Sequence, residues 1–475
     1  MCSCTSYYNK KEGYNNMYQI DFTKPIHIHF IGIGGISMSG LAEILLKEHF
    51  HISGSDAKNS DIVDNLIAMG AIVNIGQCAA NITDDIDLVV YTAAIHEDND
   101  EFAACKAKNI PMITRAQLLG QIMNNYKYSV AVSGTHGKTT TTSMLSQIFI
   151  EADTDPTISV GGMLDSIGGN IRVGKSDYFV TEACEYTNSF HAFYPYISII
   201  LNVDADHLDF FSGIDEIIES FHTFAGNLPD DGTLVVNGDM DCLPRITKDL
   251  SCNILTFGMK DTNRYYPSDV EADEKGHMNY TLMVDGKACE RVHLNIGGTH
   301  NVCNSLAAIA VADLLGIDRE YCLLGLANFG GAHRRFELKG TLGNVTVIDD
   351  YAHHPTEIKA TYTTAANTPH NELWVVFQPH TYTRTHALFE EFAEALKNFD
   401  HVILVDIYAA READTGLVHS KDLVNRIKEY GTDAKYFSSF DAVENYLLLN
   451  CKKNDLLITM GAGDVYLIGE ELLGK

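Results

Sequence analysis

Short apolar runs alternate with longer segments of helical periodicity along most of the chain. Residues 26–31 form an apolar run that ends in glycines, and residues 37–50 then repeat their apolar positions every three or four residues. This order predicts a strand followed by a helix. Because the alternation returns from residue 128 and again from residue 345, we predict an α/β protein built from repeated strand–helix units.

Breaks in this pattern divide the chain. Its 475 residues favour roughly three domains on the usual relation between length and domain number. We place an N-terminal domain at residues 17–124, a central domain at residues 125–329 and a C-terminal domain at residues 330–475. Residues 1–16 are polar and lack periodicity, so we expect them to be a disordered extension. Residues 229–295 are expected to be rich in strands, because turn signals interrupt them regularly.

A glycine loop in the middle of the chain is typical of phosphate binding. An apolar run at residues 128–132 stops at Gly134, and Lys138-Thr139 opens a helical segment. In such a loop, backbone N–H groups and the helix N-terminus face an anion, the lysine adds charge, and the hydroxyl can hold Mg²⁺. Val132 stands where the general P-loop pattern has its first glycine, so the spacing here is tighter. We interpret the motif as a nucleoside triphosphate site.

The first glycine turn has part of a dinucleotide-binding fingerprint. Gly32-x-Gly34 follows the first predicted strand, and Asp56 ends the second strand about 20 residues later. Ser37 replaces the third glycine, so the pattern does not establish a dinucleotide site. It favours a nucleotide or nucleotide-sugar site over a purely structural glycine turn. We therefore predict Rossmann-like N-terminal and C-terminal domains on either side of a central P-loop-type ATPase domain with a mixed sheet.

Carboxylates and a histidine follow strands next to the phosphate loop. Glu182 lies in a predicted strand at residues 177–183, and His207 lies in the acidic segment 204–209 after the next strand. Oxygen ligands beside bound phosphates suit Mg²⁺. Each carboxylate alone is more often a helix cap, and a lone histidine is more often a buried, hydrogen-bonded residue. Between the helix and this strand, we expect residues 161–170 to form a glycine-rich loop.

Polar clusters also punctuate the last third of the chain. Asn301 and Asn304 lie three apart and share one helical face, which suits either an adenine edge or helix capping. The arginine pair at residues 334–335 follows a glycine turn, and the polar segments 349–355 and 379–385 follow strands. Ligands of open α/β sheets gather at the carboxyl ends of strands, so these positions favour binding over a solvated surface.

The charge balance excludes some classes of partner. The chain has 34 basic and 63 acidic residues, a net charge of −29, and so lacks the basic face that nucleic acids or anionic membranes require. We find neither an apolar run of membrane-spanning length nor a signal-peptide pattern, so we expect a cytoplasmic protein without membrane insertion. The 11 cysteines are scattered without metal-site spacing, which is typical of a reducing compartment.

The ordered motifs resemble those of the Mur ligases of bacterial cell-wall synthesis. The resemblance runs from about residue 17 to the end and rests on HFIGIGGISMSGLAEIL, SGTHGKTTTT, TEACEYTNSF, NVDADHLD, HNVCNSLAA, GGAHRRFE, DDYAHHPTEI, FQPHTYTRT and GAGDV. It implies an ATP-dependent amide ligase of peptidoglycan precursor synthesis that requires Mg²⁺. The implied substrates are UDP-N-acetylmuramate on the first domain, ATP on the second, and L-alanine with part of ATP on the third. A monomer and a homodimer both remain open.

The resemblance also implies roles for individual residues. Around the triphosphate it implies Gly134, Thr135, His136, Gly137, Lys138, Thr139 and Thr140. For the rest of ATP it implies His300, Asn301, Asn304, Arg335 and, at the ribose, Asp350. For the UDP group it implies Gly34, Gly35, Ser37 and Asp56, and for L-alanine Tyr351, His353, His380 and Arg384. For metal ions it implies Thr139 and Glu182, with His207 at a second ion. We expect the catalytic set to be Lys138, Glu182, His207 and Arg335.

Two departures from the family pattern change these expectations. Thr381 stands where some members have arginine, so the alanine carboxylate is expected to depend more on Arg384. No lysine lies between residues 209 and 224, so the carbamylated lysine of other Mur ligases is expected to be absent. The proton of the alanine amine is expected to pass to His207 or His353, because histidine is the commonest general base.

Other functions compete with this interpretation. A recycling ligase that adds a preformed peptide to the same sugar nucleotide would need a larger C-terminal pocket. The first glycine turn alone would also suit an NAD-dependent dehydrogenase, but the loop at Lys138 together with Glu182 argues against it. A non-catalytic nucleotide sensor would have no need to keep Lys138, Glu182 and His207 together.

Overall fold

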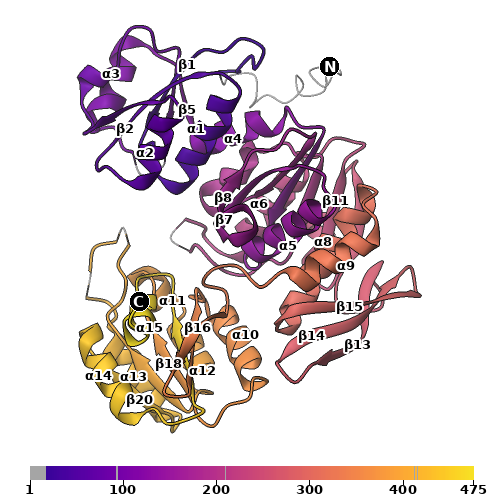
Figure 1. Cartoon of the computed structure of the whole chain (residues 1–475), viewed down its shortest axis with the longest axis vertical. Helices are drawn as coiled ribbons and strands as arrows, with labels where there is room; N and C mark the ends of the chain where they lie inside the picture. The colour runs from indigo at the N-terminus through magenta and orange to yellow at the C-terminus, as the bar shows by residue number, and fades with distance from the viewer. Residues whose placement is uncertain (1–17, 93–94, 209, 411, 415) are drawn as a thin grey trace.

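Three sheets follow one another along the chain. The computed structural model describes residues 18–92, 95–208, 210–410, 412–414 and 416–475. The extension that we predicted at residues 1–16 lies outside the described residues. The sheets form three bodies, seen from the indigo N-terminal domain to the yellow C-terminal domain in Figure 1. Among the described helices, we find none with the length and apolar character needed to cross a membrane.

The N-terminal domain is built on a five-stranded parallel sheet in the order β3-β2-β1-β4-β5. Its strands are β1 (His27–Ile31), β2 (His51–Asp56), β3 (Ile72–Ile75), β4 (Leu88–Tyr91) and β5 (Met112–Thr114). Its helices are α1 (Ile36–Lys47), α2 (Asp61–Ala68), η3 (Ala79–Asn81), α3 (Asp100–Lys108) and α4 (Arg115–Met123). Phe30 and Val90 in the central strands are fully buried, as expected for parallel strands covered by helices. The Rossmann-like prediction is confirmed.

The central domain has a ten-stranded mixed sheet in the order β15-β14-β13-β12-β11-β10-β6-β9-β7-β8. Its strands are β6 (Tyr128–Ser133), β7 (Thr157–Leu164), β8 (Gly169–Arg172), β9 (Tyr178–Glu182), β10 (Ile197–Ile200), β11 (Thr233–Asn237), β12 (Asn253–Phe257), β13 (Tyr265–Ala272), β14 (His277–Val284) and β15 (Lys287–Gly297). Its helices are α5 (Lys138–Glu151), η4 (Asp165–Ile167), η5 (Tyr186–Ala192), α6 (Ile214–Ala225), α7 (Leu243–Ile246), α8 (Thr299–Leu314) and α9 (Arg319–Asn328). The expected mixed sheet and the β-rich segment are both present.

One local prediction in this domain is wrong. The glycine-rich residues 161–170, expected to form a loop, instead belong largely to strands β7 and β8 at the edge of the sheet. The reason is a close side-chain approach: a Cβ on Gly161 would lie 2.8 Å from Glu182 Oε2, and one on Gly162 would lie 3.2 Å from Thr139 Cγ2. Glycine in a strand often marks such an approach.

The C-terminal domain has a six-stranded sheet in the order β16-β17-β21-β18-β19-β20, parallel except for β16. Its strands are β16 (Glu337–Leu342), β17 (Val345–Asp350), β18 (Leu373–Phe377), β19 (His401–Leu404), β20 (Asp433–Tyr436) and β21 (Leu456–Met460). Its helices are α10 (Pro355–Ala366), α11 (Tyr382–Ala387), α12 (Phe389–Leu396), α13 (Ser420–Glu429), α14 (Phe440–Asn450) and α15 (Tyr466–Leu472). The second Rossmann-like prediction is therefore also confirmed.

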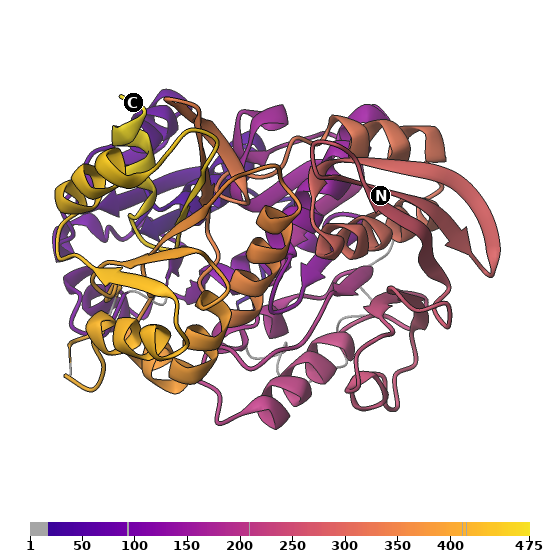
Figure 2. The ribbon, with the colours of Figure 1, turned by 90° about the horizontal axis from the view of Figure 1, so that it is seen from below.

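The central domain meets its two neighbours differently. One hydrophobic core runs continuously from strands β1 and β4 of the N-terminal domain into helix α6 of the central domain. The C-terminal domain is orange and yellow in Figure 2. Polar side chains link it to the central domain. For example, Thr356 Oγ1 donates to Asp204 Oδ2 (2.6 Å), and Arg384 Nε donates to Asp206 Oδ1 (3.0 Å).

Candidate active site

A cavity of about 800 Å³ lies where the three domains meet. Its lining includes Gly35, Ser37 and Arg115 from the N-terminal domain, Cys184, Tyr186, Asp206 and His207 from the central domain, and His380, Arg384 and Glu412 from the C-terminal domain. Most of these residues follow the carboxyl ends of strands, where open α/β sheets bind their ligands. One bound molecule could therefore contact more than one domain.

The phosphate loop lies between β6 and α5. Gly134 (φ 138°) and Gly137 (φ 85°) have backbone angles that favour glycine. A Cβ on Gly134 would lie 2.9 Å from Leu201 Cβ, and one on Gly137 would lie 2.7 Å from Asn304 Oδ1. The glycines therefore allow the loop to pack closely while it leads into the N-terminus of α5, which favours a bound anion.

Lys138 is held inside this loop. Its Nζ donates to Gly134 O (2.6 Å) and Thr135 O (3.0 Å) and pairs with Glu185 Oε2 (3.0 Å). Burial works against the charge on Lys138, but Glu185 more than offsets this and raises the lysine pKa. The lysine is therefore a fixed cation at the loop, as its predicted contact with phosphate requires.

Glu182 and Thr139 both lie against neighbouring glycines of strand β7, Glu182 at Gly161 and Thr139 at Gly162. Glu182 Oε1 accepts the N–H of Gly161 (2.6 Å), which orients the carboxylate. Its Oε2 and the hydroxyl of Thr139 have no hydrogen-bond partner among the described residues. Two oxygen donors at the end of a phosphate loop form a set that a hard divalent cation would accept.

His207, Asp206 and Arg384 form a charged group on the wall of the large cavity. Arg384 Nη2 lies 2.9 Å from Asp206 Oδ1, and His207 Nε2 lies 3.9 Å from Asp206 Oδ2. Burial opposes the Asp206 charge, but Arg384, His207 and His353 together outweigh it and hold the carboxyl pKa well below its usual range. Burial lowers the pKa of His207, while Asp206 and Glu185 oppose that shift. His207 is therefore neutral near pH 7, with its ring stacked on Tyr186 at 4.5 Å.

A second cavity, of about 290 Å³, is lined by His136, Gly137 and Thr140 of the loop. It brings together the residues predicted for the rest of ATP, namely His300, Asn301, Asn304, Arg335 and Asp350. Asn301 Nδ2 donates to Gly297 O (2.7 Å) and Asn304 Nδ2 donates to Asn301 Oδ1 (3.0 Å), so neither amide caps helix α8. Burial raises the pKa of Asp350 to about 6 and lowers that of His300 to about 4.

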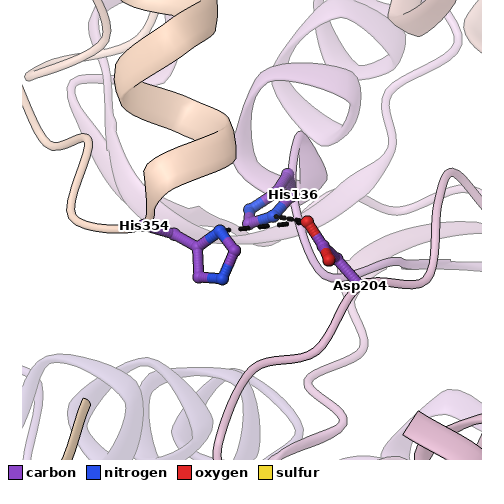
Figure 3. A group of neighbouring side chains, drawn as sticks. All are labelled: His136, Asp204 and His354. Carbon is purple, nitrogen blue, oxygen red and sulfur yellow. Dashed lines mark hydrogen bonds and ion pairs between the residues drawn. The ribbon is translucent and has the colours of Figure 1, made fainter. Parts of the chain in front are cut away.

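His136, Asp204 and His354 form a compact group between the central and C-terminal domains (Figure 3). His136 Nε2 lies 3.4 Å from Asp204 Oδ2, and its Nδ1 lies 3.2 Å from Glu357 Oε1. Burial opposes a charged His136, but Asp204 and Glu357 outweigh it and raise its pKa to about 9. Although the three side chains are close enough to share a metal ion, both nitrogens of His136 already face carboxylates. The group therefore acts as an ionic contact between domains.

Comparison with known proteins places the whole chain in one family. Its three parts match the models for the Mur ligase family, catalytic domain (residues 27–127), the Mur ligase middle domain (residues 132–312) and the Mur ligase, glutamate ligase domain (residues 334–463). A UDP-N-acetylmuramate–L-alanine ligase from Lachnospira eligens is 57% identical over 458 residues, 96% of this chain and 100% of that protein. The chain belongs to the Mur ligase family.

Solved structures agree with this assignment. The UDP-N-acetylmuramate–alanine ligase of Thermotoga maritima superposes with a TM-score of 0.78 at 29% identity, over 94% of this chain and 98% of that chain. A murein peptide ligase from Psychrobacter arcticus gives a TM-score of 0.68 at 25% identity over the same shares. The resemblance to Mur ligases that the sequence motifs showed is therefore confirmed.

In this Mur ligase the residues predicted for L-alanine fall into two layers. His380 and Arg384 line the large cavity, with 3.2 Å between His380 Nδ1 and Arg384 Nη1. Tyr351 and His353 lie next to them, with the His353 ring 5.8 Å from the His380 ring and 5.4 Å from the Tyr351 ring. Burial lowers the pKa of His353 to about 4, so that imidazole is neutral. Thr381 caps α11 by accepting the N–H of Arg384 (3.4 Å).

Of the residues predicted for the UDP group, some line the large cavity and others lie behind its wall. Gly35 and Ser37 line the large cavity at the N-terminus of α1. Asp56 lies behind them, where its Oδ2 accepts the N–H of Gly34 (2.9 Å). A Cβ on Gly34 would lie 2.9 Å from that same oxygen. Asp56 therefore shapes the glycine loop, while Gly35 and Ser37 are open to a ligand.

The contacts of four charged residues of this Mur ligase were not predicted from the sequence. These are Arg115 on the cavity wall, Glu185 at Lys138, Asp206 at Arg384, and Glu357, which faces His136 and lies 3.8 Å from Arg335. Glu185, Asp206 and Glu357 stand inside quoted motifs, yet their partners lie far away in the chain. Arg115 had a local signal, because it directly follows the end of strand β5.

Proposed function

We propose that this Mur ligase joins L-alanine to the lactoyl carboxylate of UDP-N-acetylmuramate, converting ATP to ADP and orthophosphate. The observation that carries the proposal is the cavity shared by three domains beside a phosphate loop with its lysine in place. The 57% identity to a ligase of that name over nearly the whole chain supports the choice of substrates. ATP and nucleotide-activated sugars are cytoplasmic substrates, so we also propose the cytoplasm as its compartment.

The first chemical step activates the carboxylate. A carboxylate does not form an amide with an amine at neutral pH, because oxide is a very poor leaving group. A carboxylate oxygen therefore attacks the γ-phosphorus of ATP, ADP leaves, and an acyl phosphate forms. Lys138 at the loop and Arg335 in the smaller cavity neutralise phosphate oxygens as negative charge moves toward ADP.

The donor set at the phosphate loop fits Mg²⁺. Thr139 Oγ1 and Glu182 Oε2 are hard oxygen donors without other partners among the described residues, and Gly161 leaves space beside the carboxylate. When bound there, Mg²⁺ would neutralise negative charge on the phosphate oxygens. The neutral imidazole of His207 has a lone pair available for a second ion. We assign Thr139 and Glu182 to the first ion and leave His207 free for the step that follows.

The second step forms the amide. The alanine nitrogen attacks the acyl carbon, the tetrahedral intermediate collapses, and orthophosphate leaves with the former carboxylate oxygen. Arg384 and His380 line the cavity where the amino acid would lie. His207 suits the proton of the amine better than His353, because His207 lines the large cavity, whereas burial lowers the pKa of His353 to about 4. A metal ion on His207 Nε2 would exclude this role.

The test is orthophosphate release with purified protein, Mg²⁺, ATP and UDP-N-acetylmuramate. Amino acids and a murein tripeptide are offered in turn, and each substrate is omitted once. We expect release with L-alanine only when all three substrates are present. Release with the tripeptide alone would favour the peptide-recycling alternative. Release without the sugar nucleotide would refute the proposal.

A further inference from the structure

The cations around the large cavity are not equivalent. Arg384 is paired with Asp206, and Lys138 is paired with Glu185. Arg115 also lines the cavity, and its guanidinium has no hydrogen bond or ion pair to any residue that the structure describes. Burial lowers its pKa, and the neighbouring thiol of Cys184, whose own pKa burial raises, is neutral and offers no compensating charge. A half-buried guanidinium without a partner loses hydration and gains no ion pair that would compensate. It therefore destabilises the unliganded protein.

The backbone holds Arg115 firmly in this position. It is the first residue of α4, whose N-cap Thr114 exchanges hydrogen bonds with Gln117 in a capping box. Further along the helix, a Cβ on Gly120 would lie only 2.0 Å from Ala192 O of the central domain. Helix α4 is therefore fixed against the central domain at the side of the cavity nearest Cys184. That cysteine lies between Glu182 and Glu185 in the chain, beside the phosphate loop.

The sugar nucleotide carries two anionic groups that Arg115 could bind. Its diphosphate has another partner, since Gly35 and Ser37 present the N-terminus of the long helix α1 to the cavity. The carboxylate of the sugar nucleotide has no such partner, because Arg384 is already paired with Asp206 and Lys138 is already paired with Glu185. The carboxylate must also lie beside the γ-phosphate of ATP, and two anions placed together repel each other. A guanidinium between the N-terminal domain and the phosphate loop would reduce that repulsion.

We propose that Arg115 binds the lactoyl carboxylate of the sugar nucleotide and positions it beside the phosphate loop. A guanidinium matches a carboxylate with two parallel N–H donors, which fixes the orientation of the carboxylate as well as its place. The inference rests on the proposed function for the identity of the ligand.

The test compares two sugar nucleotides that share the diphosphate and differ at the carboxylate. Binding of UDP-N-acetylmuramate and UDP-N-acetylglucosamine is measured by calorimetry for the protein and for Arg115→Met, Arg115→Lys and Lys106→Met. We expect Arg115→Met to weaken UDP-N-acetylmuramate by about 10- to 100-fold and to leave UDP-N-acetylglucosamine within about twofold. Arg115→Lys should recover part of the loss. Lys106→Met removes an exposed cation of the same domain and should change neither affinity.

Each alternative outcome is distinct. Equal weakening of both ligands by Arg115→Met would assign the arginine to the diphosphate and overturn the proposal. Unchanged affinity for both would show that Arg115 contacts neither group and would also overturn it. Retained affinity for UDP-N-acetylglucosamine shows at the same time that the variant is folded. If the unsubstituted protein bound UDP-N-acetylmuramate but released no phosphate with L-alanine, the proposed function would fail and this inference would not.

Discussion

The two interfaces of the central domain have opposite chemistry. On the N-terminal side the hydrophobic core is continuous, and Gly40 and Gly120 allow close contact, since a Cβ there would lie 2.1 Å from Ile171 Cγ1 and 2.0 Å from Ala192 O. On the C-terminal side the contacts are ionic, with His136 facing Glu357 and Arg384 facing Asp206. Apolar packing of this kind fixes two bodies, whereas a polar interface can open and close at little cost.

This difference matches the chemistry required of each side. The sugar nucleotide carries the group that is activated, so its domain must hold a constant position relative to the phosphate loop. ATP and the amino acid must enter and ADP must leave, and domain closure is a common way to admit substrates and then exclude water. The ionic contacts on the C-terminal side are the ones that such a movement would break, and the following changes test that division.

The largest effect is expected at Lys138, which lies between the two interfaces. Lys138→Ala should lower turnover by about 1,000-fold, because it removes a fixed cation from the phosphate on which negative charge develops. Phosphate release measures the loss, and the exposed Lys287→Ala on the β14–β15 hairpin serves as control. Turnover within a few-fold of normal would rule out contact between Lys138 and the γ-phosphate.

The next effect concerns the ionic interface. Arg384→Met should raise KM for L-alanine by about 10- to 100-fold and leave KM for ATP nearly unchanged, because Arg384 lines the amino-acid side of the cavity. Arg426→Met, on the outer helix α13 of the same domain, should change neither constant. An equal rise in both constants for Arg384→Met would indicate a folding defect instead of a lost carboxylate contact.

A smaller effect is expected from overpacking the apolar interface. In an open helix Gly→Ala is stabilising, but at Gly120 the new Cβ would meet the carbonyl of Ala192. Gly120→Ala should therefore lower the free energy of unfolding by about 1–3 kcal/mol. Gly330→Ala meets no atom within 4 Å and is the matched control in chemical denaturation. If Gly120→Ala stabilised the protein, the close contact between α4 and the central domain would be refuted.

The smallest effect is the pH dependence of the ionic interface. His136 has a pKa raised to about 9, above its ordinary 6.5, so its stabilising effect is complete below about pH 6.5 and is lost as pH rises through about 9. Unfolding followed from pH 6 to 10 should show this loss, and Glu357→Gln should move it to lower pH by removing one of the two carboxylates. The exposed His386→Gln should leave the profile unchanged. A profile identical for Glu357→Gln and the unsubstituted protein would contradict the ionic role of His136.

The parts of the site that the sequence predicts are those encoded within one short segment. The loop from Gly134 to Thr140 needs only a strand, two glycines and a helix in order, and the structure has all of them. Asn301 and Asn304 share a helix face for the same local reason, and that face lines the smaller cavity. Strand–helix order similarly predicts the two Rossmann-like domains.

The parts that the sequence could not give depend on contacts between distant segments. Glu185 becomes the partner of Lys138 only through the pairing of strands β6 and β9, and Asp206 meets Arg384 only when two domains close. The strands β7 and β8 were missed because their glycines signal a turn locally. They are strands because β7 pairs with β9 and β8, and the glycines are needed because Glu182 and Thr139 occupy the space that side chains would take. Arg115 directly follows a strand, which is a local signal, but its lack of a partner is visible only in the structure.

The most direct test of the account follows one oxygen atom. UDP-N-acetylmuramate labelled with ¹⁸O in its lactoyl carboxylate is converted with ATP, Mg²⁺ and L-alanine, and the released orthophosphate is analysed by mass spectrometry. If the carboxylate attacks the γ-phosphorus beside Lys138, each orthophosphate carries one oxygen from the labelled carboxylate. Orthophosphate without label, formed together with the amide, would show that no acyl phosphate is made and would contradict the account.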